Sequence, residues 1–354
     1  MSRLKKIKPN VPQADLKDYV ITLFGVPKSG KTTLAHNLGV EMYGTTEKSL
    51  LIGFEDGYKA LPGVMAESIK DWSDFKDLVD DLIEDKEDNR DNSQFQFLIL
   101  DTIDEMAEMA AKVVLPRLSK LDGKQYKNVD DVGFGRGTSA VRKEIMPVIK
   151  QLHKAGYGIC AITHDKEKKM EPKVGQAYDV TTLSLSKTLS EGIENMSDFI
   201  VFINIEVEKV NGKNETNRYM YFRSDTTFRA GSRFKSVPEK VEWGAKNFLD
   251  VFKEAVTETN KGYKGSVVTQ SPPPTEQGDD ELNESDTVEE VHTEETEETN
   301  TIDPKEIKAS IKDLDAAGKK ELKSFLEEEF GSTKLPDISE VEKYLAIQNK
   351  IDSL

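Results

Sequence analysis

The stretch Gly25-Val26-Pro27-Lys28-Ser29-Gly30-Lys31-Thr32 has the G-x-x-x-x-G-K-[ST] spacing of a phosphate-binding loop. It follows an apolar run at residues 19–24 and precedes a helical pattern at residues 33–43, which is the context that such a loop requires. Glycines let successive main-chain N–H groups point at phosphate oxygens, the lysine places a positive charge on the β- and γ-phosphates, and the final hydroxyl binds Mg²⁺. The predicted nucleotide-binding residues are Gly25, Val26, Pro27, Lys28, Ser29, Gly30, Lys31, Thr32 and Thr33.

Besides Thr32, a second metal-binding residue is predicted at the end of the apolar run Leu98-Ile99-Leu100-Asp101. A buried strand of this kind delivers one carboxylate to its C-terminal end, beside the phosphate loop, where it holds Mg²⁺ through water. Thr32 and Asp101 are therefore the predicted metal-binding pair.

Hydrolysis of a phosphate ester also needs a group that orients and deprotonates the attacking water. Glu55 ends the strand that follows the phosphate-loop helix, so it reaches the same sheet edge. Its neighbour Asp56 competes for this role, and a solvated acidic turn is the alternative without function. We predict Glu55 as the base and Lys31 as the residue that stabilises charge on the phosphates.

His164 ends another buried run, residues 158–163. A polar side chain there can contact the γ-phosphate and change a loop when that phosphate leaves. The alternative is a histidine that only caps the strand.

Strand and helix patterns alternate through the body of the chain, with apolar runs at 49–54, 95–100 and 157–163 and helical patterns at 72–82, 103–115 and 139–155. This alternation predicts an α/β fold with a mostly parallel sheet covered by helices on both faces. A hairpin signal occupies residues 211–214, and residues 165–182 have the composition of a long polar loop.

The formal charge of −16 is concentrated at the C-terminal end. Residues 271–303 hold thirteen Asp and Glu and no Lys or Arg, whereas residues 1–270 are nearly neutral. The expected organisation is an arm at 1–17, an ATPase domain at 18–264, an acidic disordered linker at 265–303 and a small helical module at 304–354. The acidic tail could compete with DNA for a basic groove or act as a spacer.

The order and spacing of the phosphate loop, Glu55, Asp101 and His164 resemble those of RecA-like recombinases, and most of all the phage-encoded RecA-like ATPases, some of which are single-strand annealing proteins. The resemblance covers about residues 18–256. It implies a RecA-like core that uses ATP and Mg²⁺, with Glu55 as catalytic glutamate and His164 as sensor.

The same resemblance implies that residues 165–189 correspond to a mobile DNA-contacting loop. The predicted DNA-binding residues are Lys166, Lys168, Lys169 and Lys173. Residues 230–234 resemble the segment that inserts basic residues into a neighbouring subunit's ATP site, which implies a catalytic role for Arg233 in trans. Gly231 stands where the companion basic residue is expected, and a surface arginine is the alternative.

We therefore expect a DNA-stimulated ATPase that acts on single-stranded DNA in phage or bacterial recombination or replication, as a homo-oligomer. Further candidates are an ATP-dependent loader of a replication protein and an ATP-binding switch that hydrolyses little. The end module is expected to bind a replication or recombination protein. No apolar stretch or secretory signal indicates a membrane, and the single cysteine, Cys160, is typical of the reducing cytoplasm.

Overall fold

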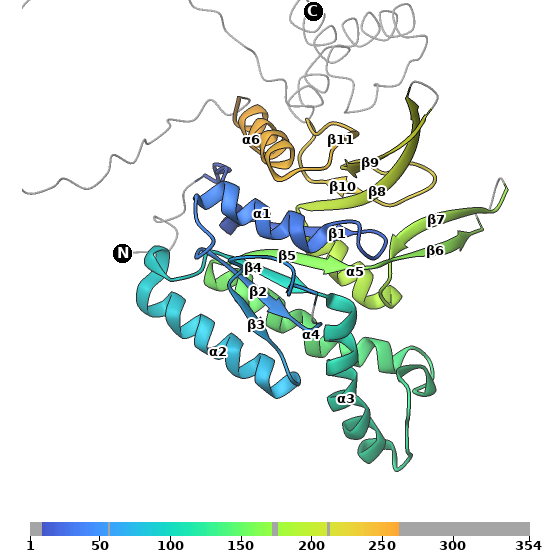
Figure 1. The fold of residues 1–354 in the computed structure, drawn as a ribbon. Coiled ribbons are helices and arrows are strands. Elements are labelled where there is room, and N and C mark those ends of the chain that lie inside the picture. Colours follow the sequence, from blue (N-terminus) through green and yellow to red (C-terminus); the bar gives the residue numbers. More distant parts are fainter. Residues whose placement is uncertain (1–8, 56, 172–175, 211–212, 262–354) are drawn as a thin grey trace, which may run out of the picture. The chain divides into compact units, whose positions relative to one another are not determined.

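The computed structural model describes residues 9–55, 57–171, 176–210 and 213–261 (Figure 1). The predictions for the linker at 265–303, the module at 304–354, Asp56 and Lys173 lie outside these residues. The end of the predicted arm lies against the body of the domain: Leu16 is fully buried, and the Asn260 side chain donates to the Pro12 carbonyl. None of the described helices combines the length and apolar character needed to cross a bilayer.

Within the described residues, the main sheet has nine strands. Parallel pairing joins β3, β2, β4, β5, β1 and β8 in that order, and β9, β11 and β10 add antiparallel. The bounds are β1 (Val20–Phe24), β2 (Ser49–Gly53), β3 (Ala66–Ser68), β4 (Phe97–Asp101), β5 (Gly158–Thr163), β8 (Phe199–Val210), β9 (Lys213–Tyr221), β10 (Gly231–Ser232) and β11 (Lys240–Glu242). The predicted α/β fold with a mostly parallel sheet is confirmed, and so is the β8–β9 hairpin.

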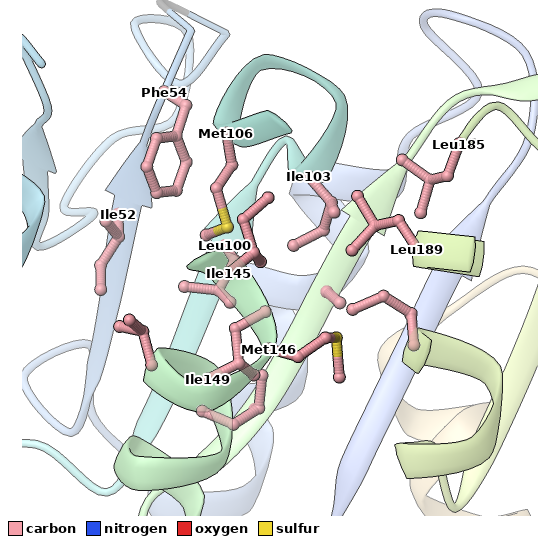
Figure 2. Packing of buried hydrophobic residues seen from close by; sticks show 14 of the residues in the cluster. Ile52, Phe54, Leu100, Ile103, Met106, Ile145, Met146, Ile149, Leu185 and Leu189 are labelled. Atoms are coloured by element: carbon pink, nitrogen blue, oxygen red, sulfur yellow. The ribbon is translucent and has the colours of Figure 1, made fainter. Parts of the chain in front are cut away.

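Helices cover both faces of this sheet (Figure 1). One face packs against α1 (Lys31–Tyr43) and α6 (Ala245–Lys261), and the other against α2 (Trp72–Asn89), α3 (Ile103–Asp122), α4 (Arg136–Ala155) and α5 (Lys187–Met196). Successive strand residues serve opposite faces: Leu100 packs among Ile103, Met106 and Ile145 (Figure 2), whereas its neighbour Ile99 belongs to the core beneath α1. Burial on both faces explains why these strands are continuous apolar runs.

Two helices are longer than the sequence pattern predicts. Helix α2 continues from the predicted end at residue 82 to Asn89, and α3 continues from the predicted end at residue 115 through Pro116 to Asp122. A proline removes one helical hydrogen bond, but the turns on either side keep theirs, and Val114 and Leu118 still pack on the core.

The expectation of a polar loop at 165–182 is wrong. Residues 165–170 and 178–183 form a two-stranded antiparallel ribbon of β6 (Asp165–Met170) and β7 (Tyr178–Leu183), in register from Asp165 with Leu183 to Met170 with Tyr178. Cross-strand pairing satisfies the main-chain groups, so a segment with few apolar residues can still be regular. Buried Val180 and Leu183 attach β7 to the body of the domain.

Candidate nucleotide-binding site

The phosphate loop connects β1 to α1 and has the backbone conformation that its glycines allow. Gly25 has φ 150°, Gly30 has φ 95° and Lys28 has φ 65°. A Cβ atom at Gly25 would lie 2.4 Å from the carbonyl oxygen of Ile203 on β8, so only glycine fits there. Val26, Pro27 and Lys28 are exposed at the top of the loop, while the Ser29 side chain is buried.

Lys31 lies at the start of α1 and is 6% exposed. Its ammonium group donates to the carbonyl oxygens of Gly25 at 2.8 Å and Val26 at 3.0 Å. Burial lowers the pKa of Lys31, and the nearby carboxylates of Asp165 and Asp101 oppose that shift. The positive charge is therefore held inside the curve of the loop, where a phosphate would replace the carbonyls as its partner.

Thr32 and Asp101 come together as the sequence predicts. Thr32 Oγ1 donates to Asp101 Oδ2 at 2.8 Å, across the gap between the loop and β4. Burial of Asp101 raises the pKa of its carboxyl group to about 6. The other oxygen, Oδ1, is buried and has no hydrogen-bond partner among the described residues.

A hydroxyl and a buried carboxylate with a free oxygen suit Mg²⁺, which prefers oxygen ligands and keeps several waters. In the described part of the chain, no cluster of three or more His, Cys, Asp or Glu side chains could hold a metal by itself. Thr32 would hold the ion directly and Asp101 through water, with phosphate oxygens completing the site. Bound there, Mg²⁺ would neutralise charge on the phosphates.

Glu55 lies at the same sheet edge, just after β2. The main-chain N–H groups of Phe54 and Glu55 both donate to the Asp101 carbonyl, at 2.8 and 3.4 Å, so β2 and β4 remain paired to their ends. A Cβ atom at Gly57 would lie 3.5 Å from Glu55 Oε1 and 3.9 Å from Asp101 Oδ2. The two carboxylates therefore face one small volume beside the loop.

His164 follows β5, the strand between β1 and β4, and so reaches the same sheet edge as the phosphate loop and Asp101. Its N–H donates to Asp104 Oδ2 at 3.1 Å, and its ring Nδ1 lies 3.7 Å from the same oxygen. Its carbonyl oxygen accepts from the N–H of Ser184, just after β7. His164 is thus held by α3 on one side and by the base of the ribbon on the other.

Asp104 and Asp165 are polar groups of this site that the sequence patterns do not identify. Asp104 is on the first turn of α3, three residues after Asp101, and Asp165 directly follows His164. Acidic residues at a helix start usually serve the helix dipole, so Asp104 carries no distinctive signal. Asp165 could have been identified from the sequence by its position directly after His164.

The predicted DNA-binding lysines occupy the first strand of the ribbon. Lys168 is exposed, and Lys169 is exposed with its ammonium group 3.7 Å from Glu171 Oε1. The Lys166 side chain makes a contact within the domain, because its ammonium group donates to the Leu185 carbonyl. Lys166 and Lys168 line a groove between the ribbon and α5, together with Lys187 and Arg229.

Arg233 is not near the phosphate loop of its own chain. Its guanidinium pairs with Asp198 Oδ1 at 3.2 Å and donates to the Asn195 carbonyl at 2.6 Å. The Asp198 side chain accepts from Val20 N–H at the start of β1, whereas the phosphate loop follows the end of β1. Arg233 therefore lies at the opposite edge of the sheet from the phosphate loop.

Trp243 contacts the phosphate loop from beyond β11, and sequence patterns gave no sign of it. A Cβ atom at Gly30 would lie 3.1 Å from Trp243 Cζ2 and 3.3 Å from its Nε1. Gly30 is the residue that caps the N-terminus of α1. The indole ring thus covers the loop on the side away from Asp101.

Two sequence comparisons relate the chain to known proteins. The sequence model of the AAA domain family matches residues 17–234, more than half of the chain. A similar protein is the SPbeta prophage-derived uncharacterized protein YorG of Bacillus subtilis (strain 168), 29% identical over 161 residues, which are 45% of this chain and 45% of YorG. The match therefore spans less than half the length of that relative.

Proposed function

The chain belongs to the AAA domain family of P-loop ATPases, and we propose that it hydrolyses ATP with Mg²⁺ and acts on single-stranded DNA in phage or bacterial recombination or replication. The observation that carries the ATPase part is the 2.8 Å hydrogen bond between Thr32 and Asp101, with the Glu55 carboxylate facing the same volume. A loop that only bound phosphates, without transfer of the γ-phosphoryl group, would not need a carboxylate beside the metal-binding pair.

Each residue has a role that follows from its place. Lys31 exchanges the loop carbonyls for β- and γ-phosphate oxygens and balances their charge. Thr32 and Asp101 orient the metal. Glu55 accepts a proton from the water that attacks the γ-phosphate, because its carboxylate faces the same volume as Asp101 and is not itself held by Thr32.

The DNA part of the proposal rests on the link between the site and the ribbon. His164 contacts Asp104 beside the ATP site, and its carbonyl is bonded to Ser184 at the base of β7. A shift of His164 on loss of the γ-phosphate would pass directly into β6, which begins at the next residue. The exposed Lys168 and Lys169 on that strand are suited to DNA phosphates.

We carry the resemblance to RecA-like recombinases into this proposal, with a homo-oligomer in the host cytoplasm as the working assembly. The position of Arg233 at the edge opposite the loop suits a role in a neighbouring subunit's site. The prophage origin of YorG supports a phage setting. The C-terminal module is proposed to bind a replication or recombination protein.

An ATPase assay with and without single-stranded DNA tests the proposal. We expect slow hydrolysis by the chain alone and several-fold stimulation by single-stranded DNA. Hydrolysis that DNA leaves unchanged would favour a loader of another protein, and nucleotide binding without turnover would favour a switch module.

A further inference from the structure

A groove adjoins the phosphate loop on the side away from the Asp101 and Glu55 carboxylates. It is lined by Ile205, Thr216, Asn217, Arg218, Glu242 and Trp243. These residues come from β8, β9 and the end of β11, which lie on the opposite side of β1 from β4 and β2.

The direction in which a nucleotide would lie follows from what stands on the two sides of the phosphate loop. Asp101 and Glu55 mark the γ-phosphate end, on the β4 and β2 side of the loop. The α-phosphate and the nucleoside must therefore leave the loop on the other side, towards β8 and β9. Gly30 is at that exit, and Trp243 is the side chain that packs over it.

The groove is built as a continuation of the core. Ile203, Met220 and Val241 form a row across β8, β9 and β11 that is covered by α1 and α6. The next row on the same face is Ile205, Arg218 and Trp243, because Ile205 pairs with Arg218 and the Trp243 N–H donates to the Arg218 carbonyl at 2.9 Å.

This second row leaves apolar surface uncovered. Ile205 is 36% exposed, and Val207 beyond it is 65% exposed. The Arg218 guanidinium lies 5.8 Å from the centre of the Trp243 ring, a cation–π arrangement that also presents a flat, charged surface. An aromatic ring, an aliphatic side chain and a guanidinium together provide the kind of surface on which a flat heterocycle stacks.

The indole nitrogen gives a second, independent indication. Trp243 Nε1 is buried and has no hydrogen-bond partner among the described residues, although a buried donor without a partner is costly. It lies beside Gly30, where an oxygen atom of a nucleotide leaving the loop would pass.

We propose that this groove is the nucleobase subsite of the phosphate-loop site and that the base stacks against Trp243, with Arg218 and Ile205 as its other walls. The inference rests on the proposed nucleotide-binding function. It assigns base recognition to the antiparallel end of the sheet, whereas the reaction takes place at the parallel end.

The test compares binding of a non-hydrolysable ATP analogue with binding of inorganic triphosphate, both with Mg²⁺, to the full-length chain by calorimetry. Trp243→Ala should weaken binding of the analogue at least about fivefold, as expected for loss of one base–aromatic stack. The affinity of the Trp243→Ala variant for inorganic triphosphate should stay at the parent value. Trp243→Phe, which keeps an aromatic ring, should bind the analogue nearly as well as the parent.

Intrinsic fluorescence supplies a second measurement, because the chain has only two tryptophans. Trp72 is 3% exposed and donates to Glu144, on the face of α2 and α4. Nucleotide-dependent quenching should therefore vanish in Trp243→Phe and persist in Trp72→Phe. If Trp243→Ala does not fold, Arg218→Gln should show a weaker form of the same selective loss, with the exposed Lys213→Gln on the same strand as its control.

Equal weakening of the analogue and of inorganic triphosphate by Trp243→Ala would overturn the inference, since Trp243 would then only shape the loop. Unchanged binding of both would overturn it as well. A parent chain that binds neither ligand would refute the proposed function itself, which is a distinct result.

Discussion

The main-chain N–H of His164 donates to Asp104 Oδ2 at 3.1 Å, which joins the end of β5 to the first turn of α3. Because α3 begins two residues after Asp101, this bond connects β4, which carries Asp101, to β5, the strand that leads into the ribbon. Asp104 is thereby a positioning residue for His164.

Removal of the Asp104 carboxylate, which accepts the His164 N–H, should uncouple movement of the ribbon from the state of the nucleotide. We expect Asp104→Ala to bind ATP like the parent but to lose most of its stimulation by single-stranded DNA, because His164 is no longer held between α3 and Ser184. Asp104→Asn keeps an oxygen acceptor and should retain most of the stimulation. The exposed neighbour Glu105 supplies the matched control, Glu105→Gln, and equal losses in all three variants would contradict this role.

If Glu55 is the general base, its substitution should affect ATP hydrolysis but not ATP binding. Glu55→Gln should bind ATP with parent affinity but lose at least about 100-fold in hydrolysis rate, since the amide cannot accept the proton. Glu67→Gln, at an exposed position on the adjacent strand β3, is the control. Parent-like hydrolysis by Glu55→Gln would return the role to Asp56.

Lys31→Ala tests the phosphate contact. It should abolish hydrolysis and weaken ATP binding, because the β- and γ-phosphates lose their point charge. Lys253→Ala on α6 should leave both unchanged. ATP binding by Lys31→Ala at the parent affinity would show that the loop does not use this charge.

The ribbon lysines can be tested through salt dependence. Single-stranded DNA binding should weaken as salt rises, and the double variant Lys168→Ala/Lys169→Ala should lower the slope of log K against log salt by about 0.7 for each phosphate that the variant no longer neutralises. Basal ATPase should persist. We exclude Lys166 from this variant because its bond to the Leu185 carbonyl makes it part of the fold, and an unchanged slope would rule out the ribbon as the DNA site.

Asp101 should reduce the stability of the metal-free, nucleotide-free chain. Its pKa is raised to about 6 by burial, against about 3.9 in the unfolded chain. The carboxyl is neutral in both states well below pH 4, so it imposes no penalty there, and the penalty grows as the pH rises from about 4 to 6. Asp101→Asn should therefore raise the free energy of unfolding by roughly 1–3 kcal/mol at pH 8.

Denaturant unfolding of both proteins in chelator at pH 8 and at pH 4 measures this effect. The difference between them should be much smaller at pH 4 than at pH 8, because the folded-state carboxyl is then neutral and the unfolded one is only about half ionised. A difference that is the same at both pH values would mean that the gain comes from packing rather than from removal of a buried charge.

The sequence alone determined the parts of the site that depend on local chemistry. The phosphate loop is recognisable because its glycines, Lys31 and Thr32 act within eight consecutive residues. Asp101 is predictable because a parallel strand buried on both faces must be an apolar run, and its end must reach the loop edge. The α/β class followed from the same alternation.

Only the tertiary structure decided which distant groups join that site. Main-chain pairing across β6 and β7, rather than any apolar pattern, makes the ribbon regular. The strand order places His164 against Asp104, sends Arg233 to the opposite edge and brings Trp243 onto Gly30. These contacts join residues up to 213 positions apart, and no local pattern records them, because each depends on how whole strands and helices pack.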